Sequence, residues 1–496
     1  MFEWRFWMTP GVVPQPFLDN AYLAGWGRIP SITQNRIFDN EIVVRAEILT
    51  SGSFHVPMFH SPLGVIMEST ESLLGRSEPY LLVRELARGS LGKFYRRLFD
   101  WQMLGFQQPP DLEDRVRQIA KRFASLIVQQ PFSLEIEREY VVVLDELALL
   151  IVDENREIAE QSLSWKLRND ERLPVVLGIG MNNQRIESLH EFAAYAQLLR
   201  NSFHVVLPML TWRELEPQPD HFAWERLENL LLPPSRFGFS VVFGPLLSFS
   251  PETFPEWVLP HLDKDGFFES RASRFVNTLT ERYSYLAHSW ILANRFVDQT
   301  IPAIPPKRSI ALIRILAQQM RSRGISSPII VGINQPWGEY ALQRVPDWEQ
   351  VQIAEALMGC RDIDTFLLEM DFGYGESLTL PRDPMCIGNM IDQWSFLGKR
   401  VYVSFSFPSA GNPVAAEVDF PSEFQWSEER QRLWTEMLLL TLLSKRSVRG
   451  IFWSCLQDPV TPYQSTSTVN YGLVNEHRVV KPAFTHFPTT KTHLLW

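Results

Sequence analysis

Two acidic residues placed two positions apart form the most chemically suggestive pattern in the chain. Glu369 and Asp371 lie in the otherwise apolar run 367–371. In a β-strand, residues i and i+2 face the same side of the sheet, so both carboxyl groups would project together. Buried, neighbouring carboxyl groups have perturbed pKa values, which suits acid–base catalysis. Alternatively, either side chain could form a structural ion pair with Arg295 or Arg382.

A second polar and aromatic cluster follows an earlier apolar run. Residues 335–340 read Gln-Pro-Trp-Gly-Glu-Tyr. Trp337 could stack on a sugar ring, and Glu339 could serve as an acid, a base or a hydrogen-bond acceptor. The other interpretation is a turn in which Glu339 makes a local salt bridge. The sequence alone leaves both open.

The elements that would position these residues show a regular alternation from residue 173 onwards. Apolar, strand-like runs cover residues 175–180, 204–212, 239–248, 290–294, 328–334, 366–371, 401–407 and 450–456. Helical stretches between them include residues 189–199, 271–286, 310–323, 350–358, 385–397 and 430–443. Eight strands separated by helices predict an α/β fold, a (β/α)8 TIM barrel. In such barrels the active site forms at the carboxyl ends of the strands.

The first third of the chain has a different pattern. Residues 1–78 contain short β-like runs broken by Pro, Gly, Asn and Ser, which predicts a β-rich N-terminal domain that could bind carbohydrate. Residues 79–170 have helical periodicity and are predicted to form a helical connecting region. The barrel would then occupy residues 171–496.

Composition and missing motifs exclude several classes of function. A formal net charge of -10 argues against a nucleic-acid partner, because phosphate binding needs clustered positive charge. The cysteines, Cys360, Cys386 and Cys455, lack metal-ligand spacing and are predicted to be buried thiols that suit a reducing compartment. No nucleotide- or metal-binding motif appears, so we expect no cofactor and no metal.

The sequence shows no targeting signal that would direct the protein out of the cytoplasm. The first residues have no cationic start followed by an apolar stretch and a small-residue cleavage site, so no signal peptide is predicted. No run is apolar for as long as a membrane span requires. We therefore expect a cytoplasmic protein that does not associate with membranes.

The strand ends resemble those of glycoside hydrolase family 10, the clan A family of endo-1,4-β-xylanases. Trp212 and Glu216 match a Trp and a Glu-Pro after the second strand, Trp257 matches a Leu-Pro-x-Trp motif, and Asn294 matches the Asn that precedes the catalytic acid. Trp453 and the segments 472–473 and 481–484 match the end of the family's barrel. The resemblance covers residues 173–490 and implies a poly- or oligosaccharide partner. The candidate substrate-binding residues are Trp212, Glu216, Trp257, Asn294, Arg295, Trp337 and Trp453.

The sequence departs from the family at the positions that carry out its chemistry. Arg295 stands where the family has its acid/base glutamate, and Ser404 aligns with the nucleophilic glutamate. Pro245 and Ser250 replace two sugar-binding histidines. An arginine cannot act as a general acid near neutral pH, and a serine needs activation to act as a nucleophile. The resemblance therefore implies a barrel without the usual retaining mechanism.

Three functions agree with these observations. The first is a degenerate glycoside hydrolase barrel, a pseudoenzyme that binds a glycan or serves as an interaction module. The second is an active O-glycosyl hydrolase with relocated catalytic carboxylates, Glu339 with Glu369 or Asp371. The third is a different barrel enzyme in which Arg295 recognises an acidic substrate. The contacts of Arg295 and the mutual positions of the three carboxyl groups distinguish among them.

Overall fold

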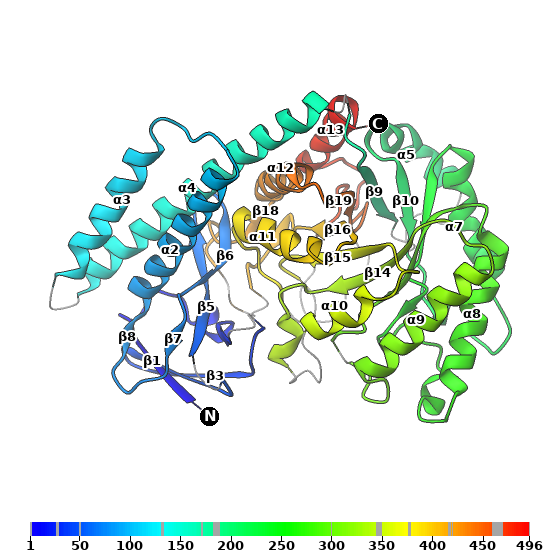
Figure 1. The fold of residues 1–496 in the computed structure, drawn as a ribbon, viewed down its shortest axis with the longest axis horizontal. Coiled ribbons are helices and arrows are strands. Elements are labelled where there is room, and N and C mark those ends of the chain that lie inside the picture. Colours follow the sequence, from blue (N-terminus) through cyan, green and yellow to red (C-terminus); the bar gives the residue numbers. More distant parts are fainter. Residues whose placement is uncertain are drawn as a thin grey trace.

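The computed structural model describes residues 2–25, 29–48, 51–129, 133–169, 172–181, 189–298, 300–343, 350–374, 378–414, 418, 420–458 and 470–495. Figure 1 shows a barrel on the right and an N-terminal unit of strands and helices on the left. A long helix, α4 (Leu134–Asn169), runs from the N-terminal unit to the barrel.

Eight parallel strands of the described chain close into the barrel. They are β9 (Val176–Met181), β10 (Val205–Pro208), β11 (Ser240–Phe243), β13 (Ala287–Asn294), β14 (Ile329–Asn334), β15 (Thr365–Asp371), β16 (Arg400–Ser406) and β19 (Val448–Trp453). Pairing of β19 with β9 and of β11 with β13 completes the ring, and β12 (Leu247–Ser248) extends it beside β13. The predicted (β/α)8 barrel is confirmed.

Helices connect the strands and cover the outside of the barrel. They are α5 (Leu189–Ser202), α7 (Trp224–Arg236), α8 (Phe267–Tyr283), α9 (Pro306–Ser322), α10 (Gln350–Met358), α11 (Pro384–Ser395) and α12 (Glu428–Ser444), followed by α13 (His486–Leu494). The run 239–248 is two strands, β11 and β12, rather than one. Helix α7 contains Pro233 and Pro234, which are usual helix breakers, but both lie near its end.

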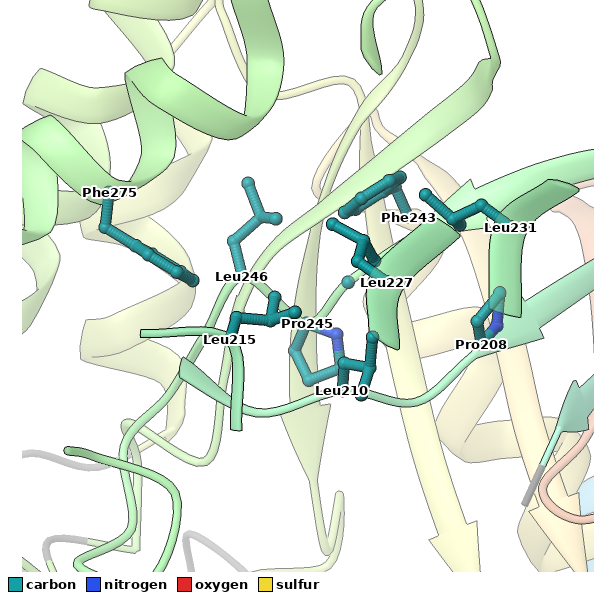
Figure 2. Close-up of a pocket in the computed structure, with 10 residues that line it drawn as sticks. Pro208, Leu210, Leu215, Leu227, Leu231, Phe243, Pro245, Leu246 and Phe275 are labelled. Atoms are coloured by element: carbon teal, nitrogen blue, oxygen red, sulfur yellow. The ribbon is translucent and has the colours of Figure 1, made fainter. Parts of the chain in front are cut away.

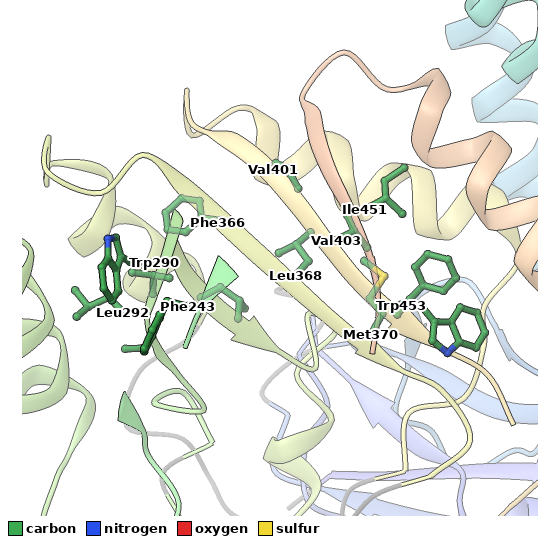
Figure 3. Packing of buried hydrophobic residues seen from close by; sticks show 14 of the residues in the cluster. Phe243, Trp290, Leu292, Phe366, Leu368, Met370, Val401, Val403, Ile451 and Trp453 are labelled. Carbon is green, nitrogen blue, oxygen red and sulfur yellow. The ribbon is translucent and has the colours of Figure 1, made fainter. Parts of the chain in front are cut away.

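Side chains of the barrel strands alternate between the helices and the lumen. Figure 3 shows Phe366, Leu368 and Met370 of β15 beside Val401 and Val403 of β16, all within the cluster that packs under the helices. The intervening residues form a separate apolar cluster inside the barrel: Val205, Leu207, Val242, Ile291, Ile330, Leu367, Tyr402 and Phe452. The same alternation brings polar side chains to the lumen nearer the carboxyl ends of the strands.

Two glycines make room for aromatic rings in the lumen. A Cβ atom added at Gly178 would lie 2.3 Å from the ring of Phe452, and one at Gly450 would lie 2.8 Å from the ring of Tyr402.

We expect Gly178→Ala to lower the free energy of unfolding by about 1–3 kcal/mol, because the ring of Phe452 must shift in a packed core. Urea denaturation measures this loss. Gly359→Ala, where an added Cβ meets nothing within 4 Å, is the matched control and should lose less; equal losses would contradict the packing.

The N-terminal β-rich region contains two small sheets. One has the order β3 (Thr33–Phe38), β4 (Glu41–Ala46), β1 (Phe2–Trp7), β8 (Tyr80–Leu81). The other has the order β2 (Tyr22–Ala24), β5 (Ser51–His60), β6 (Gly64–Ser69), and β7 (Leu73–Leu74) also pairs with β5. The pairs are antiparallel except for β1 with β8. A short helix, α1 (Gln15–Asp19), lies between the first two strands of the chain.

Helices α2 (Leu82–Met103), α3 (Leu112–Ile127) and α4 share a hydrophobic cluster with these sheets. Trp4 and Phe54 of the strands and Leu86 and Leu144 of the helices are among its buried members. The helices therefore complete the core of the N-terminal unit in addition to connecting it to the barrel. The domain boundaries near residues 78 and 170 remain predictions.

Two further sequence features can be read in the described residues. None of the described helices combines the length and the apolar composition of a membrane span. The described chain has no disulfide bond; Cys360 and Cys455 are buried and Cys386 is half-buried.

Candidate functional site

A polar layer lies in the lumen toward the carboxyl ends of the strands. It consists of Asn294 (β13), Asn334 (β14), Glu369 and Asp371 (β15), Ser404 and Ser406 (β16) and Ser454, which follows β19. In the register of β15 and β16, Glu369 lies opposite Ser404 and Asp371 opposite Ser406. The register of β13 shifts between Ile291 and Ala293, which turns Asn294 toward Glu369.

Glu369 occupies the deeper part of this layer. The side-chain amide of Asn294 donates to both carboxyl oxygens, at 3.0 and 3.3 Å. A Cβ atom at position 332 would lie 3.0 Å from Glu369 Oε1, so Gly332 leaves the space that the carboxyl group fills. Burial raises the pKa of Glu369 to about 7; the Asn294 bond opposes this shift, and the charge on Asp371 adds to it. The group can therefore hold or release a proton near neutral pH.

Arg295 pairs with an acidic residue that the sequence did not single out. It has a left-handed φ of 55°, and its Nε lies 3.3 Å from Oδ2 of Asp298. The same oxygen accepts a bond of 3.0 Å from the amide of Asn334. Burial raises the pKa of Asp298 to about 6, and Arg295 opposes that shift. The observed ion-pair partner is thus Asp298, whereas the sequence suggested Glu369 or Asp371.

Asp371 is exposed at the end of β15 and is held by hydroxyl groups. Its Oδ1 accepts hydrogen bonds from Tyr374 at 2.9 Å, Ser406 at 3.1 Å and Ser454 at 2.7 Å. The Ser454 hydroxyl also lies 3.3 Å from that of Ser404. A chain of hydroxyl groups therefore connects Asp371 to the position that the resemblance assigns to the nucleophile.

Glu339 belongs to a different set of contacts. It lies in the 3-10 helix η2 (Glu339–Leu342), and its Oε1 is 2.8 Å from the guanidinium of Arg382. Both side chains are at most 5% exposed. Arg382 also donates to the hydroxyl of Tyr22 at 2.7 Å and lies 4.3 Å from the ring centre of Trp337. The structure brings Glu369 and Asp371 together and directs Glu339 to the junction with the N-terminal unit.

The Trp212 motif folds into the short helix α6 (Trp212–Leu215). Thr211 and Glu214 form a reciprocal capping box that fixes the start of this helix. The indole of Trp212 is buried, stacks on Phe275 at 4.9 Å, and donates to Glu216 at 2.8 Å. Glu216 is buried as well, so this pair braces the loop after β10.

The other aromatic candidates also make internal bonds. Trp453 is fully buried, and its indole donates to the carbonyl of Tyr471 at 3.0 Å. Trp257 is half-buried and donates to the carbonyl of Glu216 at 3.0 Å. Trp337 is half-buried beside Arg382. Among the candidates, Trp257 and Trp337 retain exposed surface, while Trp212 and Trp453 have none with which to stack on a sugar.

The barrel wall at β10 and β11 is apolar, although the resemblance led us to expect polar groups there. Figure 2 shows a small cavity there, lined by Pro208, Leu210, Leu215, Leu227, Leu231, Phe243, Gly244, Pro245, Leu246 and Phe275. Pro245, which the resemblance aligns with a histidine, is part of this lining. Ser250, which the resemblance aligns with the other histidine, is buried and donates to Glu252. Neither position presents an imidazole group to a ligand.

Several residues of the polar layer had not been predicted. Asn334, Ser406 and Ser454 could have been found by continuing the period-two pattern of each strand to its carboxyl end. Tyr374 and Asp298 lie in loops, where no periodicity indicates which way a side chain points. The described residues include no group of three or more His, Cys, Asp or Glu arranged to hold a metal ion.

A comparison with solved structures identifies the architecture. The chain is similar to xylanase 10B from Thermotoga petrophila RKU-1 in complex with xylobiose, with a TM-score of 0.50 and 13% identity over 68% of this chain and 97% of that one. The barrel has the family 10 glycoside hydrolase fold. Xylanase 10B from Thermotoga maritima (TM-score 0.49, 13% identity, 68% of this chain and 98% of that one) is also similar. So is a family 10 xylanase from Thermobacillus composti (TM-score 0.46, 15% identity, 66% and 99%).

The similarity concerns the fold. No known family profile matches the sequence, and no curated protein matches it. The family 10-like barrel inferred from short motifs at the strand ends is nevertheless confirmed by the closed barrel and by the Thermotoga petrophila xylanase. The N-terminal unit lies outside the region that the resemblance covers.

Proposed function

We propose that this glycoside hydrolase-like barrel binds a poly- or oligosaccharide at the carboxyl ends of its strands and does not cleave it by the family's retaining mechanism. The observation that carries the proposal is the pair of contacts at the two key positions. Arg295 is bonded to Asp298, and the hydroxyl of Ser404 faces that of Ser454. Retaining hydrolysis needs two carboxyl groups about 5–5.5 Å apart, and neither position supplies one.

The chemistry of the polar layer supports a sugar as the ligand. Amides, hydroxyls and carboxyl groups together offer both donors and acceptors, as a sugar hydroxyl requires. Asp371 is exposed and already oriented by three hydrogen bonds through one oxygen. The similar Thermotoga petrophila enzyme is a xylanase in complex with xylobiose, so xylo-oligosaccharides are the first ligands to test.

A second candidate function is favoured by Glu369 and Asp371. A carboxyl group with a pKa of about 7 can act as a general acid at neutral pH, and a second carboxyl group lies two residues further along the same face. In this alternative the protein is an O-glycosyl hydrolase in which Glu369 protonates the leaving oxygen. Asp371 would then serve as the nucleophile or as the base.

Binding and hydrolysis assays separate the two candidates. We expect the parent protein to bind xylo-oligosaccharides in isothermal titration calorimetry without releasing reducing sugar from xylan, β-glucan or mannan. Asp371→Asn should weaken binding about tenfold, because it removes a charged hydrogen-bond acceptor. Glu113→Gln, at a carboxyl group 81% exposed on α3, is the matched control and should retain parental affinity.

The outcomes assign the role of each carboxyl group. Sugar release that disappears in Glu369→Gln or Asp371→Asn would overturn the binding proposal in favour of the hydrolase. Release of reducing sugar that disappears in Glu339→Gln, with the protein still folded, would show that Glu339 takes part in hydrolysis. A parent protein that binds none of these glycans would contradict both candidates.

A further inference from the structure

Three buried side-chain oxygens in and beside the polar layer have no hydrogen-bond partner among the described residues. Within the described chain, Oδ1 of Asn294, Asp298 and Asn334 has no hydrogen-bond partner. The two asparagines are 9% exposed and the Asp298 side chain 7%. The amide nitrogens of both asparagines are already engaged, with Glu369 and with Asp298. A ligand at this place must therefore bring donors, because a buried acceptor without one is unfavourable.

The charges at the same place point in the same direction. Three carboxyl groups lie at this end of the barrel: the charges of Asp298 and Asp371 both act on Glu369, and the guanidinium of Arg295 opposes them. That guanidinium is bonded to Asp298. An acidic sugar would bring further acceptors and negative charge, so this arrangement disfavours the acidic substrate that Arg295 alone suggested. An ammonium group carries three donors, no acceptor and a positive charge, which complements both features.

We propose that the site takes an amino sugar with an unacetylated ammonium group, such as a glucosamine residue of an oligosaccharide. The ammonium group lies among the oxygens of Asn294, Asn334 and Asp298, and Asp371 accepts from a neighbouring sugar hydroxyl. This inference rests on the proposed glycan-binding function and names the class of sugar.

The raised pKa values of the carboxyl groups predict that the affinity for an amino sugar depends on pH. Burial raises the pKa of Asp298 to about 6 and that of Glu369 to about 7. Arg295 and the amides of Asn294 and Asn334 act on them, Asp371 acts on Glu369, and Asp298 itself also raises the pKa of Glu369. A bound cation stabilises the ionised carboxylates, so the affinity for an amino sugar rises with pH from about pH 5 toward about pH 7, as long as the amino group of the sugar keeps its proton. A neutral sugar lacks this charge coupling.

Calorimetry on the full chain tests the preference. The probes are a glucosamine oligosaccharide, the matching N-acetylglucosamine oligosaccharide and a xylo-oligosaccharide of equal length. At about pH 7 we expect the glucosamine oligosaccharide to bind at least about tenfold more tightly than either neutral probe. Asp298→Asn and Glu369→Gln should each reduce that preference about tenfold, while Glu113→Gln should retain it.

The outcomes keep this inference separate from the function on which it rests. Binding of xylo-oligosaccharide with no preference for glucosamine overturns the inference and leaves the glycan-binding function intact. A preference that survives both Asp298→Asn and Glu369→Gln also overturns it, because general attraction to an acidic protein then explains the result. Absence of binding to all three probes overturns both proposals. If either variant fails to fold by circular dichroism, Asn334→Ala provides the same test by removing one amide oxygen.

Discussion

Replacing Arg382 with methionine is expected to lower the free energy of unfolding by about 3–5 kcal/mol, because it leaves the buried Glu339 carboxyl without its counter-ion. The substitution also removes the donor to the Tyr22 hydroxyl, which lies in the N-terminal unit. Urea denaturation followed by circular dichroism measures the loss. Its magnitude reports how much the junction between the two parts of the molecule depends on this pair.

A double variant provides the control for this prediction. Glu339→Leu combined with Arg382→Met replaces the ion pair with apolar side chains and should restore most of the lost stability, since buried pairs can often be exchanged for apolar residues. A single variant that loses less than about 1 kcal/mol would show that Glu339 is solvated and available for chemistry. The double variant also separates a structural role of Glu339 from a catalytic one.

Replacing Glu369 with glutamine is expected to change how stability depends on pH. Burial raises the pKa of this carboxyl group from 4.5 to about 7 on folding. Below both values the group is protonated in the folded and unfolded states and does not affect the balance. As the pH rises between them, the unfolded chain ionises first, so the parent protein loses up to about 3 kcal/mol, fully lost above the folded pKa.

The glutamine variant has no such proton to lose, so thermal unfolding at two pH values provides the test. At about pH 8 the variant should be more stable than the parent by about 2–3 kcal/mol, and at about pH 4 the two should be similar. Asp298 contributes a change of the same sign in both proteins, because burial also raises its pKa. The exposed Glu113→Gln variant should follow the parent throughout. Parallel pH profiles for the parent and Glu369→Gln would contradict the raised pKa of Glu369.

Most of the barrel could be predicted because its strands and helices are long and strongly patterned. The run 350–358 coincides with α10, and the run 366–371 differs from β15 by one residue. The run 204–212 was too long, because its apolar residues continue past β10 into the loop before α6. Hydrophobicity alone does not distinguish a strand from a buried loop, so boundaries were the less reliable part.

The site was predictable only where strand periodicity determines the direction of a side chain. Glu369 and Asp371 face the lumen because both lie on one regular strand. The partner of Glu339 could not be derived in this way, since Arg382 comes from a loop more than one element away. Trp212 follows β10 and Trp453 ends β19, which are the strands to which the motifs assigned them. Whether an indole faces a cleft or braces a loop depends on packing that a motif does not encode.

Helix α4 connects the N-terminal unit rigidly to the barrel. Its 36 residues correspond to a length of about 54 Å at the usual rise of 1.5 Å per residue. Near its end, Asn155, Ser162 and Lys166 donate hydrogen bonds to α12 of the barrel, while its earlier residues lie in the core of the N-terminal unit. One continuous helix therefore contacts both the N-terminal unit and the barrel. A hinge rotation that separated the two parts would have to break these hydrogen bonds or the helix itself, so α4 holds the N-terminal unit against the barrel.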